Sequence, residues 1–339
     1  MIIVVVWRVF IVKNPGDPMI LPHRKPSVRG ILESKGNLKE LITVINDLLK
    51  YEMDISILPS GNAGLYMASY ILRSIEKKKC ENILVPDMGG WRGFLEYPKM
   101  FKFNVVKLKT NLGVVDPSTL EDTLRKNDIY ALFLTTLGGY LVRQPMEEIK
   151  KVCEDMDVIL VEDASGGIGG ACGYGDIVVC STGSPKIINC EYGGFIGINK
   201  KIGDLLRDNG KIDELKSLLK AFKVMNIYGL MKEEALNARK TYRRLVEYCN
   251  ILKEELEGAY FRGKEGVCVF VEHEDPREVS KRVNEVIKLD NGKSFITKCP
   301  IYERILKKGI VLEMKKVDIH YLSTEDIYEM VDILKKLLY

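Results

Sequence analysis

Short apolar runs alternate with amphipathic stretches between about residues 55 and 200. Continuous apolar runs predict buried strands, and apolar positions three or four residues apart predict helices. The predicted strands cover 83–86, 104–108, 131–135, 157–163, 176–181 and 194–198. The predicted helices include 62–76, 117–126 and 145–155, where Pro145 stands at a position suited to a first-turn proline. This alternation is typical of an α/β fold in which a mainly parallel sheet lies between helices.

The pattern changes after residue 200. Two long charged stretches predict helices, and a compact alternation of strands and helices follows them. These elements are helices 211–223 and 230–257, strand 266–272, helix 276–288, strand 309–314 and helix 323–338. We therefore predict an N-terminal strand or arm (1–20), a large domain (21–229), and a linker helix with a small C-terminal α/β domain (230–339).

Composition excludes several classes of protein. The 339 residues include 51 Lys and Arg against 47 Asp and Glu, and 46% are apolar. The net charge of +4 gives no case for a nucleic-acid partner, and the apolar content is that of a folded protein. The apolar N-terminus is interrupted by Arg8 and is too short to span a membrane, so no membrane partner is expected.

The eight cysteines are scattered, with no CxxC pair, and the chain has only three histidines. This distribution argues against a structural zinc site, and we predict that the protein holds no metal. Cysteines in apolar runs behave as small hydrophobic side chains. We expect free thiols and a reducing cytoplasm.

A turn of small residues, Ser60–Gly64, leads into an apolar-periodic helix. Gly61, Asn62 and Ala63 would occupy the first turn of that helix, where backbone N–H groups are unpaired and the helix dipole is positive. Such a turn can bind a phosphate. The alternative is that Ser60 or Asn62 only caps the helix.

Two further candidates follow predicted strands. Glu162, Asp163 and Ser165 lie at the end of strand 157–163, where an acid either serves a ligand or caps the next helix. Lys186 lies just after strand 176–181 among small and apolar residues. A lone lysine is ordinarily a solvated surface charge. A partly desolvated lysine has a lowered pKa, which suits Schiff-base chemistry.

Together these groups match what pyridoxal phosphate requires of a protein. The cofactor needs an anchor for its phosphate, an acid that keeps its pyridine nitrogen protonated, and a lysine for its aldehyde. Ligands of α/β sheets bind at the carboxyl ends of strands, where the acid and the lysine lie. The sequence therefore predicts a pyridoxal-phosphate enzyme.

The same stretches resemble the DegT/DnrJ/EryC1/StrS aminotransferases, a family of fold-type I pyridoxal-phosphate enzymes, over roughly residues 20 to 240. SGNAGLYMA resembles the SGTAAL phosphate turn of that family, VEDAS resembles its VEDAA, and GYGDIVVCSTGSPK resembles GSFGDIGCFSFYPTK. Looser parallels are VPDMGGW, LGGYLVRQPMEEI, CEYGG and MNIYGLMKEEAL. The resemblance implies a fold-type I large domain and a transferase activity.

The resemblance also implies residue roles. Lys186 matches the Schiff-base lysine, and Asp163 matches the partner of the pyridine nitrogen. Trp91 would stack on the cofactor ring, although it falls one position later than in the family pattern. Asn226 would reach the phosphate of a neighbouring subunit, which implies a homodimer with shared active sites. The remaining phosphate ligands implied are Gly61, Asn62, Ala63 and Ser181.

The chain departs from the family pattern at the glutamine three residues after the aspartate, which is Gly166 here. The partner of the cofactor's phenolic oxygen is then open, and Ser165 is a possible substitute. Asp163 and Lys186 are 23 residues apart, which is shorter than usual and predicts a trimmed hairpin between 166 and 175.

The resemblance favours an aminotransferase that takes its amino group from glutamate and passes it to a nucleotide-linked keto sugar. One alternative is a fold-type I lyase or desulfurase, which would need a carboxylate-binding arginine such as Arg304 or Arg282. Another is a non-catalytic regulator that kept the fold. A basic cluster of Arg24, Lys25 and Arg29 is expected on the solvated surface.

Overall fold

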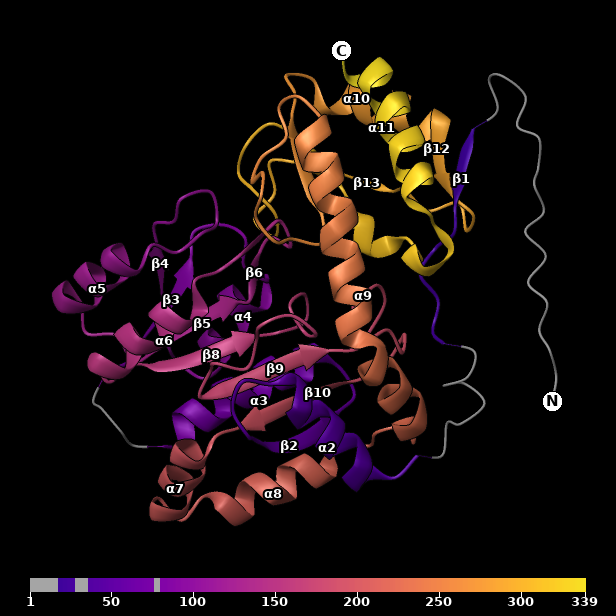
Figure 1. Ribbon diagram of the computed structural model, residues 1–339. Helices are drawn as coiled ribbons and strands as arrows, with labels where there is room; N and C mark the ends of the chain where they lie inside the picture. Colours follow the sequence, from indigo (N-terminus) through magenta and orange to yellow (C-terminus); the bar gives the residue numbers. More distant parts are fainter. Residues whose placement is uncertain (1–17, 28–35, 76–79) are drawn as a thin grey trace.

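A computed structural model describes residues 18–27, 36–75 and 80–339, and Figure 1 shows their arrangement. The chain forms a large part around a central sheet and a smaller part at its C-terminal end. The long helix α9 (Tyr228–Glu255) runs from one part into the other. Arg29 and the predicted arm up to residue 17 lie outside the described residues.

The central sheet of the described chain has seven strands. Its spatial order is β2 (Asp54–Leu58), β10 (Gly194–Ile198), β9 (Ile177–Ser181), β8 (Ile159–Asp163), β5 (Ala131–Thr135), β3 (Asn82–Pro86) and β4 (Asn104–Leu108). β10 is antiparallel to both of its neighbours, and the other pairs are parallel. The predicted mainly parallel α/β sheet is confirmed.

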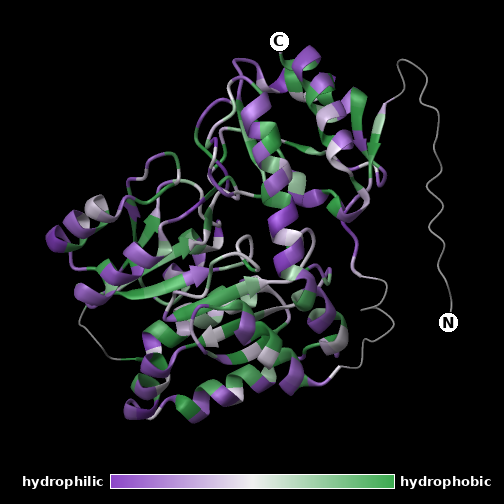
Figure 2. Ribbon diagram, viewed as in Figure 1, coloured by the Kyte–Doolittle hydropathy of each residue, from purple (hydrophilic) through white to green (hydrophobic). Residues whose placement is uncertain are grey.

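Alternating side chains along the strands pack against helices on both faces of the sheet. Ile83 and Val85 of β3 face a cluster that includes α3, α4, α7 and α8, whereas Leu84 faces a cluster with α5 and α6. Apolar strand positions therefore concentrate in the centre while polar residues cover the outer helix faces (Figure 2). The helices of this part are α2 (Leu38–Leu48), α3 (Gly61–Ser74), α4 (Gly93–Met100), α5 (Pro117–Lys126), α6 (Met146–Asp155), α7 (Lys200–Asp208) and α8 (Ile212–Ala221).

The smaller part contains the antiparallel sheet β11 (Val269–Glu272), β14 (Gly309–Leu312) and β13 (Ile296–Cys299). Helices α10 (Pro276–Val286) and α11 (Thr324–Leu338) and the 3-10 turns η1 (Met314–Lys316) and η2 (Ile319–Tyr321) accompany it. The helix predicted over 276–288 ends earlier, because its last residues begin strand β12 (Ile287–Leu289). β12 pairs in parallel with β1 (Met19–Leu21), so the first described strand joins the C-terminal part.

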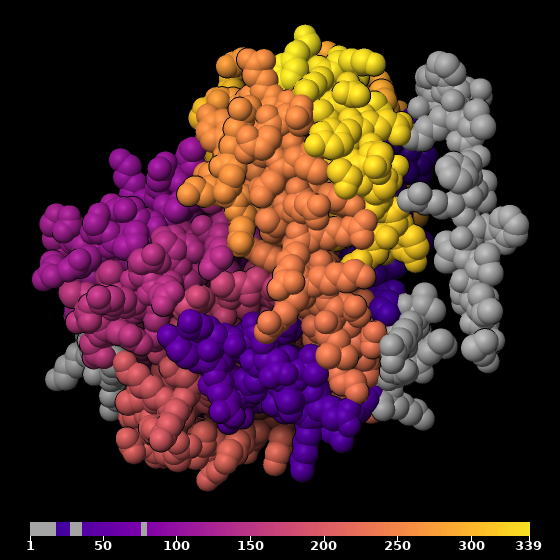
Figure 3. Space-filling view, viewed as in Figure 1, coloured from indigo at the N-terminus to yellow at the C-terminus, as the bar shows by residue number. Residues whose placement is uncertain are grey.

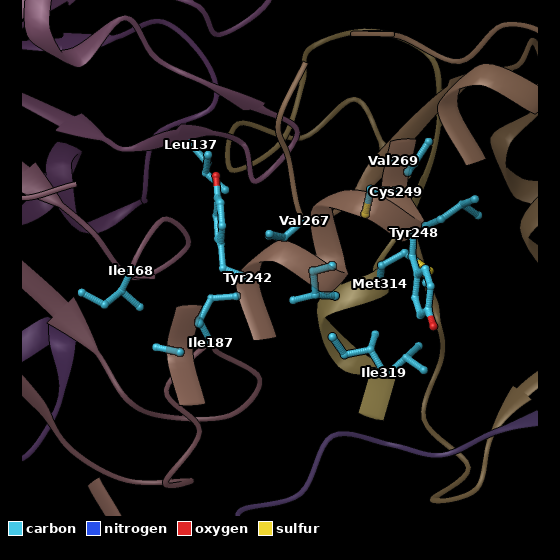
Figure 4. Packing of buried hydrophobic residues seen from close by; sticks show 14 of the residues in the cluster. Leu137, Ile168, Ile187, Tyr242, Tyr248, Cys249, Val267, Val269, Met314 and Ile319 are labelled. Carbon is cyan, nitrogen blue, oxygen red and sulfur yellow. The ribbon is translucent and has the colours of Figure 1, made fainter. Parts of the chain in front are cut away.

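One apolar cluster joins the two parts. It contains Leu137 and Ile187 of the large part, Tyr242 of α9, and Val267 and Met314 of the small part. Figure 4 shows these side chains converging around α9. In the space-filling view, the surface of α9 is continuous with that of the C-terminal residues and that of the large part (Figure 3). The apolar core therefore continues from the large part through α9 into the small part.

A short hairpin, β6 (Leu137–Gly138) and β7 (Val142–Arg143), projects from the sheet toward the small part. Among the described residues, no helix is both long enough and apolar enough to cross a membrane.

Candidate active site

The candidate residues gather at one edge of the central sheet. Asp163 is the last residue of β8, and Ser181 is the last residue of β9. The Ser60 turn follows β2, which runs in the same direction as β9. The antiparallel β10 begins at this edge, where Gly194 pairs with both Leu58 and Ser181. The sheet thus brings the Ser60 turn to the same edge as Asp163 and Ser181, which follow it by more than 100 residues in the sequence.

The turn before α3 has the geometry of an anion site. Ser60 caps the helix, and its Oγ accepts a hydrogen bond from Ala63 N at 3.1 Å. A Cβ added to Gly61 would lie 2.6 Å from Ser181 Cβ, so only glycine lets the turn pack directly on β9. The first turn of α3 contains no acidic residue. Its N–H groups and positive dipole end are therefore not neutralised by the helix itself.

Trp91 lies beside this turn. Its indole Nε1 donates a hydrogen bond to Asn62 Oδ1 at 2.9 Å. Asn62 is exposed and Trp91 is half-buried. The two residues that the resemblance assigns to the ring and to the phosphate are therefore neighbours, and stacking on the ring stays a prediction.

A short hydrogen-bond relay links β8 to β9. Asp163 Oδ1 accepts from Ser165 N at 3.0 Å, and Ser165 Oγ accepts from Ser181 N at 2.7 Å. Ser165 is buried, and its hydrogen bonds link the end of β8 to the end of β9. Within the described ranges, no group donates to Asp163 Oδ2, so one carboxylate oxygen is available to a ligand.

The adjacent acid Glu162 has a different role. It is fully buried, and it accepts hydrogen bonds from Thr136 Oγ1 at 2.7 Å and from the backbone N–H groups of Gly173, Tyr174 and Gly175. Burial raises the pKa of Glu162, although these donors oppose the rise. Glu162 therefore fastens the short 166–175 segment to the sheet and does not face the site.

Lys186 is half-buried, and its Nζ donates a hydrogen bond to the hydroxyl of Tyr140. Burial lowers the pKa of Lys186, but the Tyr140 oxygen and the negative charge of Asp163 outweigh burial, so the pKa is raised overall. The lowered pKa expected from the sequence is therefore wrong for the protein without ligand. The carboxylate of Asp163 is thus close enough to influence the Lys186 amine.

A charged cluster from the small part lies next to Tyr140. The Arg304 guanidinium is 4.8 Å and the Lys315 ammonium 4.7 Å from the centre of the tyrosine ring. Both cations are bonded to the buried Glu313, which also accepts from Thr297 Oγ1 at 2.6 Å. Sequence reasoning considered only Arg304 of these residues. The Gly-Gly-Tyr sequence inside LGGYLVRQP was the available signal for Tyr140.

Three other predicted residues come from segments outside the central sheet. Asn226 is exposed on the segment before α9, and its role toward a neighbouring subunit stays a prediction. Arg24 is buried and forms an ion pair with Glu234, so the expected solvated position is wrong for this residue. Arg24 also donates to Ile187 O at 3.4 Å, so the pair supports the loop that carries Lys186. Lys25 is exposed, as expected.

A cavity of about 940 Å³ lies between the segment 22–27, α9 and η2, outside the Lys186 site. Its charged lysine and arginine side chains are matched by three acids, Glu191, Glu234 and Asp318, so its lining does not favour an anion. Neither Lys186 nor Asp163 lines it. This cavity is therefore separate from the residues that carry the candidate chemistry.

No group of three or more His, Cys, Asp or Glu side chains in the described part of the chain could hold a metal ion. All eight cysteines belong to that part, and each is buried and free.

The residues at the sheet edge fit pyridoxal phosphate. The uncompensated first turn of α3 next to Ser181 fits the phosphate, and the open oxygen of Asp163 fits a protonated pyridine nitrogen. Lys186 supplies the amine. These groups come from three separate chain segments, and each retains bonding capacity that the protein does not use.

Comparison with known proteins agrees with this fold. Residues 239–335 match the model of the MJ1341 family C-terminal domain. An uncharacterized aminotransferase of Methanocaldococcus jannaschii is 27% identical over 203 residues, which cover 56% of this chain and 49% of the relative. The match thus spans about half the length of that relative.

Three solved structures share the architecture over nearly the whole chain. An alanine–glyoxylate aminotransferase from Nostoc sp. has a TM-score of 0.70 at 12% identity, and 97% of both chains is covered. A ureidoglycine–glyoxylate aminotransferase from Bacillus subtilis has a TM-score of 0.69 at 14% identity, covering 96% of this chain and 94% of that one. A 3-amino-5-hydroxybenzoic acid synthase has a TM-score of 0.66 at 11% identity, covering 95% and 99%. The chain therefore has the fold-type I architecture of these aminotransferases, as the sequence predicts.

Proposed function

We propose that the protein is a pyridoxal-phosphate-dependent aminotransferase whose cofactor is attached to Lys186. The observation that carries this proposal is the meeting of Lys186, Asp163 and the α3 turn at one sheet edge. A shared fold does not fix an activity, but these groups and their unused bonding capacity supply the chemistry that the activity needs. When bound, the cofactor acts as an electron sink for the carbon that loses its proton.

Each of these site residues has a defined role in the proposed reaction. The Lys186 amine holds the cofactor and, once released by an amino donor, carries a proton at Nζ as general acid and base. Asp163 Oδ2 keeps the proton on the pyridine nitrogen. Ser181 and the N–H groups of the α3 turn hold the phosphate, and Trp91 covers the ring.

The test uses the purified wild-type protein mixed with pyridoxal phosphate. We expect a visible absorption band that borohydride fixes covalently, with the added mass on the peptide that contains Lys186. Addition of glutamate should then remove the band as its amino group passes to the cofactor. A protein that binds no cofactor at Lys186, or whose band no amino donor changes, contradicts the proposal. The second result would favour the non-catalytic regulator.

The acceptor is the finer part of the proposal. The sequence motifs support a nucleotide-linked keto sugar with glutamate as donor. Arg304 and Lys315 beside Tyr140 support a second candidate, a small keto acid, because two cations share one carboxylate there. The cofactor is first converted with glutamate, and return of the visible band is then followed with either a nucleotide-linked keto sugar or glyoxylate. The compound that restores the visible band faster identifies the class of amino acceptor.

Assembly and location complete the proposal. The position of Asn226 on an exposed segment supports a homodimer in which this side chain reaches the site of the second copy. Light scattering of the purified protein tests this, since a monomer would leave Asn226 without a role. The eight buried free cysteines support a cytoplasmic location.

A further inference from the structure

Tyr140 contacts the reactive amine directly. It lies in the hairpin between β6 and β7, and its hydroxyl oxygen accepts a hydrogen bond from Lys186 Nζ. Its backbone has φ of 67°, in the left-handed region that a tyrosine rarely adopts. A strained residue that touches a reactive atom points to a functional constraint.

The ring of Tyr140 occupies the space next to Gly166. A Cβ added to Gly166 would lie 2.7 Å from Tyr140 Cδ1 and 2.8 Å from Cε1. No side chain at position 166 fits beside this ring. The glycine at position 166, where the family pattern has glutamine, is therefore required by the tyrosine ring at position 140.

The small part fixes the backbone of the hairpin. The carbonyl oxygen of Tyr140 accepts from Val267 N at 2.9 Å and from Cys268 N at 3.1 Å. The next carbonyl, that of Leu141, accepts from Nζ of the buried Lys253 at 3.2 Å. These bonds hold the residue in its unusual conformation, and they aim the hydroxyl at Lys186.

Two cations of the small part hold the ring itself. Arg304 and Lys315 each lie less than 5 Å from its centre, at 4.8 and 4.7 Å. Both are fixed in turn by Glu313. The tyrosine thus has little freedom to rotate away from Lys186, so its hydroxyl is available at a defined place beside the amine.

We propose that Tyr140 is a further catalytic residue, which orients Lys186 Nζ in the free protein and donates its hydroxyl hydrogen to the cofactor's phenolic oxygen in the loaded one. It would thereby take over the task of the missing glutamine. The inference rests on the proposed attachment of the cofactor to Lys186. Attachment takes two hydrogens from the neutral amine, and they leave with the aldehyde oxygen as water. Nζ then has fewer hydrogens to share, which frees the hydroxyl to donate.

The first test compares Tyr140→Phe with wild type by titrating the visible band of the loaded protein. A hydroxyl that donates to the phenolic oxygen stabilises its negative form. We expect its removal to raise the midpoint of the colour change by about one pH unit. Tyr248→Phe is the matched control, because the Tyr248 hydroxyl is bonded to Leu322 O at 2.9 Å in the small part and should leave the midpoint unchanged. An unchanged midpoint in Tyr140→Phe overturns the inference.

The second test needs no cofactor. The Tyr140 hydroxyl raises the pKa of Lys186 in the free protein, so Tyr140→Phe should leave more neutral amine at neutral pH. We expect trinitrobenzenesulfonate to label Lys186 several-fold faster in this variant, as measured on the Lys186 peptide by mass spectrometry. Equal labelling rates in Tyr140→Phe and wild type would show that the hydroxyl does not govern the amine.

Substitutions at positions 140 and 166 test whether the Tyr140 ring occupies the space that a glutamine at position 166 would need. Gly166→Gln alone should prevent cofactor attachment, because its Cβ collides with the ring. Tyr140→Ala with Gly166→Gln has room for the glutamine, and its colour midpoint should return toward that of wild type. A double variant with the midpoint of Tyr140→Ala would overturn the exchange. If wild type itself attaches no cofactor, the proposed function fails, whereas attachment with no effect of any Tyr140 variant contradicts only the present inference.

Discussion

The two ends of the neighbouring strands β8 and β9 have similar residues nearby with different roles. Asp176 precedes β9, and its Oδ1 accepts from Lys150 Nζ at 2.7 Å and from Asn199 Nδ2 at 2.8 Å. Its Oδ2 accepts from Leu160 N at 2.9 Å. Lys150 and Asp176 are both buried. At this end, a buried lysine and aspartate are paired, and Asn199, Leu160 and Glu154 supply their remaining partners.

The carboxyl end has a lysine and an aspartate too, but they are not paired in this way. Lys186 donates to a tyrosine, and Asp163 keeps one oxygen without a protein donor within the described ranges. Residue type alone therefore does not identify a functional site. A site is identified by charged groups whose bonding capacity is partly unused and whose positions are fixed by neighbouring residues.

The largest expected effect is on activity, and it distinguishes Lys186 from Lys150. Lys186→Met should lower transamination by at least about 10³-fold, because it removes both the attachment point and the proton carrier. The free energy of unfolding should change by less than about 1 kcal/mol, since no fully paired charge is broken. Steady-state rates and denaturant unfolding measure the two quantities. Retained turnover would remove Lys186 from the mechanism.

Lys150→Met should show the reverse. It leaves the Asp176 carboxylate buried without its countercharge, which we expect to destabilise the protein by about 3 kcal/mol. The folded fraction should still attach the cofactor at Lys186. The neighbouring Lys151 is exposed on the same helix, so Lys151→Met is the matched control and should cost almost nothing. Equal losses of stability in Lys150→Met and Lys151→Met would mean that the buried ion pair contributes no more than an exposed lysine.

The elements that the sequence predicted well are those whose pattern is local. Helix 117–126 was predicted with both boundaries correct, because Asp116 caps it, Pro117 begins it and Arg125 and Lys126 end it. The strand β12 could not be separated from helix α10, since its three residues depend on pairing with the distant β1. Short strands draw their stability from partners that a local pattern does not include.

The candidate site divides in the same way. Lys186 and Asp163 follow recognisable strands and the Ser60 turn precedes a recognisable helix, so their motifs were visible. Tyr140 was not, because its place beside Lys186 depends on hydrogen bonds to Val267 and Cys268, more than 120 residues later. The sign of the Lys186 pKa shift was missed for the same reason. Burial could be inferred from apolar neighbours, but the phenol that opposes it could not.

Acid should weaken the protein through Glu313. Burial alone would raise the pKa of this carboxyl, but Lys315 and Arg304 outweigh it and hold the pKa well below the usual range. A lowered pKa stabilises the fold above the ordinary glutamate value, about 4.3, and that stability is lost as the pH falls below it.

Denaturant unfolding between about pH 5 and pH 3 measures the contribution of Glu313. Stability should fall with pH in wild type, and the fall should be smaller in Glu313→Gln. Lys151→Met is the control, because it removes an exposed positive charge and leaves no buried carboxylate without its countercharge. The acid slope of Lys151→Met should therefore equal that of wild type, and an unchanged slope in Glu313→Gln would contradict the role of Glu313.

The smallest effect tests whether the α3 turn is kept free of acids for a phosphate. Some helices have acids in their first turn, such as Glu147 in α6 and Glu325 in α11, whereas α3, like α5 and α7, has none. Asn62→Asp keeps the oxygen that accepts from Trp91. It should stabilise the free protein by about 0.3–1 kcal/mol through the helix dipole, and it should weaken binding of pyridoxal phosphate by charge repulsion.

Pyridoxal without its phosphate is the matched control ligand for Asn62→Asp. The variant should bind it as wild type does, since the repelled group is absent. Thermal unfolding of the free protein and titration with both ligands separate the two contributions. If pyridoxal phosphate binds Asn62→Asp as tightly as wild type, the phosphate does not lie at this turn. The absence of acids there would then concern only the packing of Gly61 on Ser181.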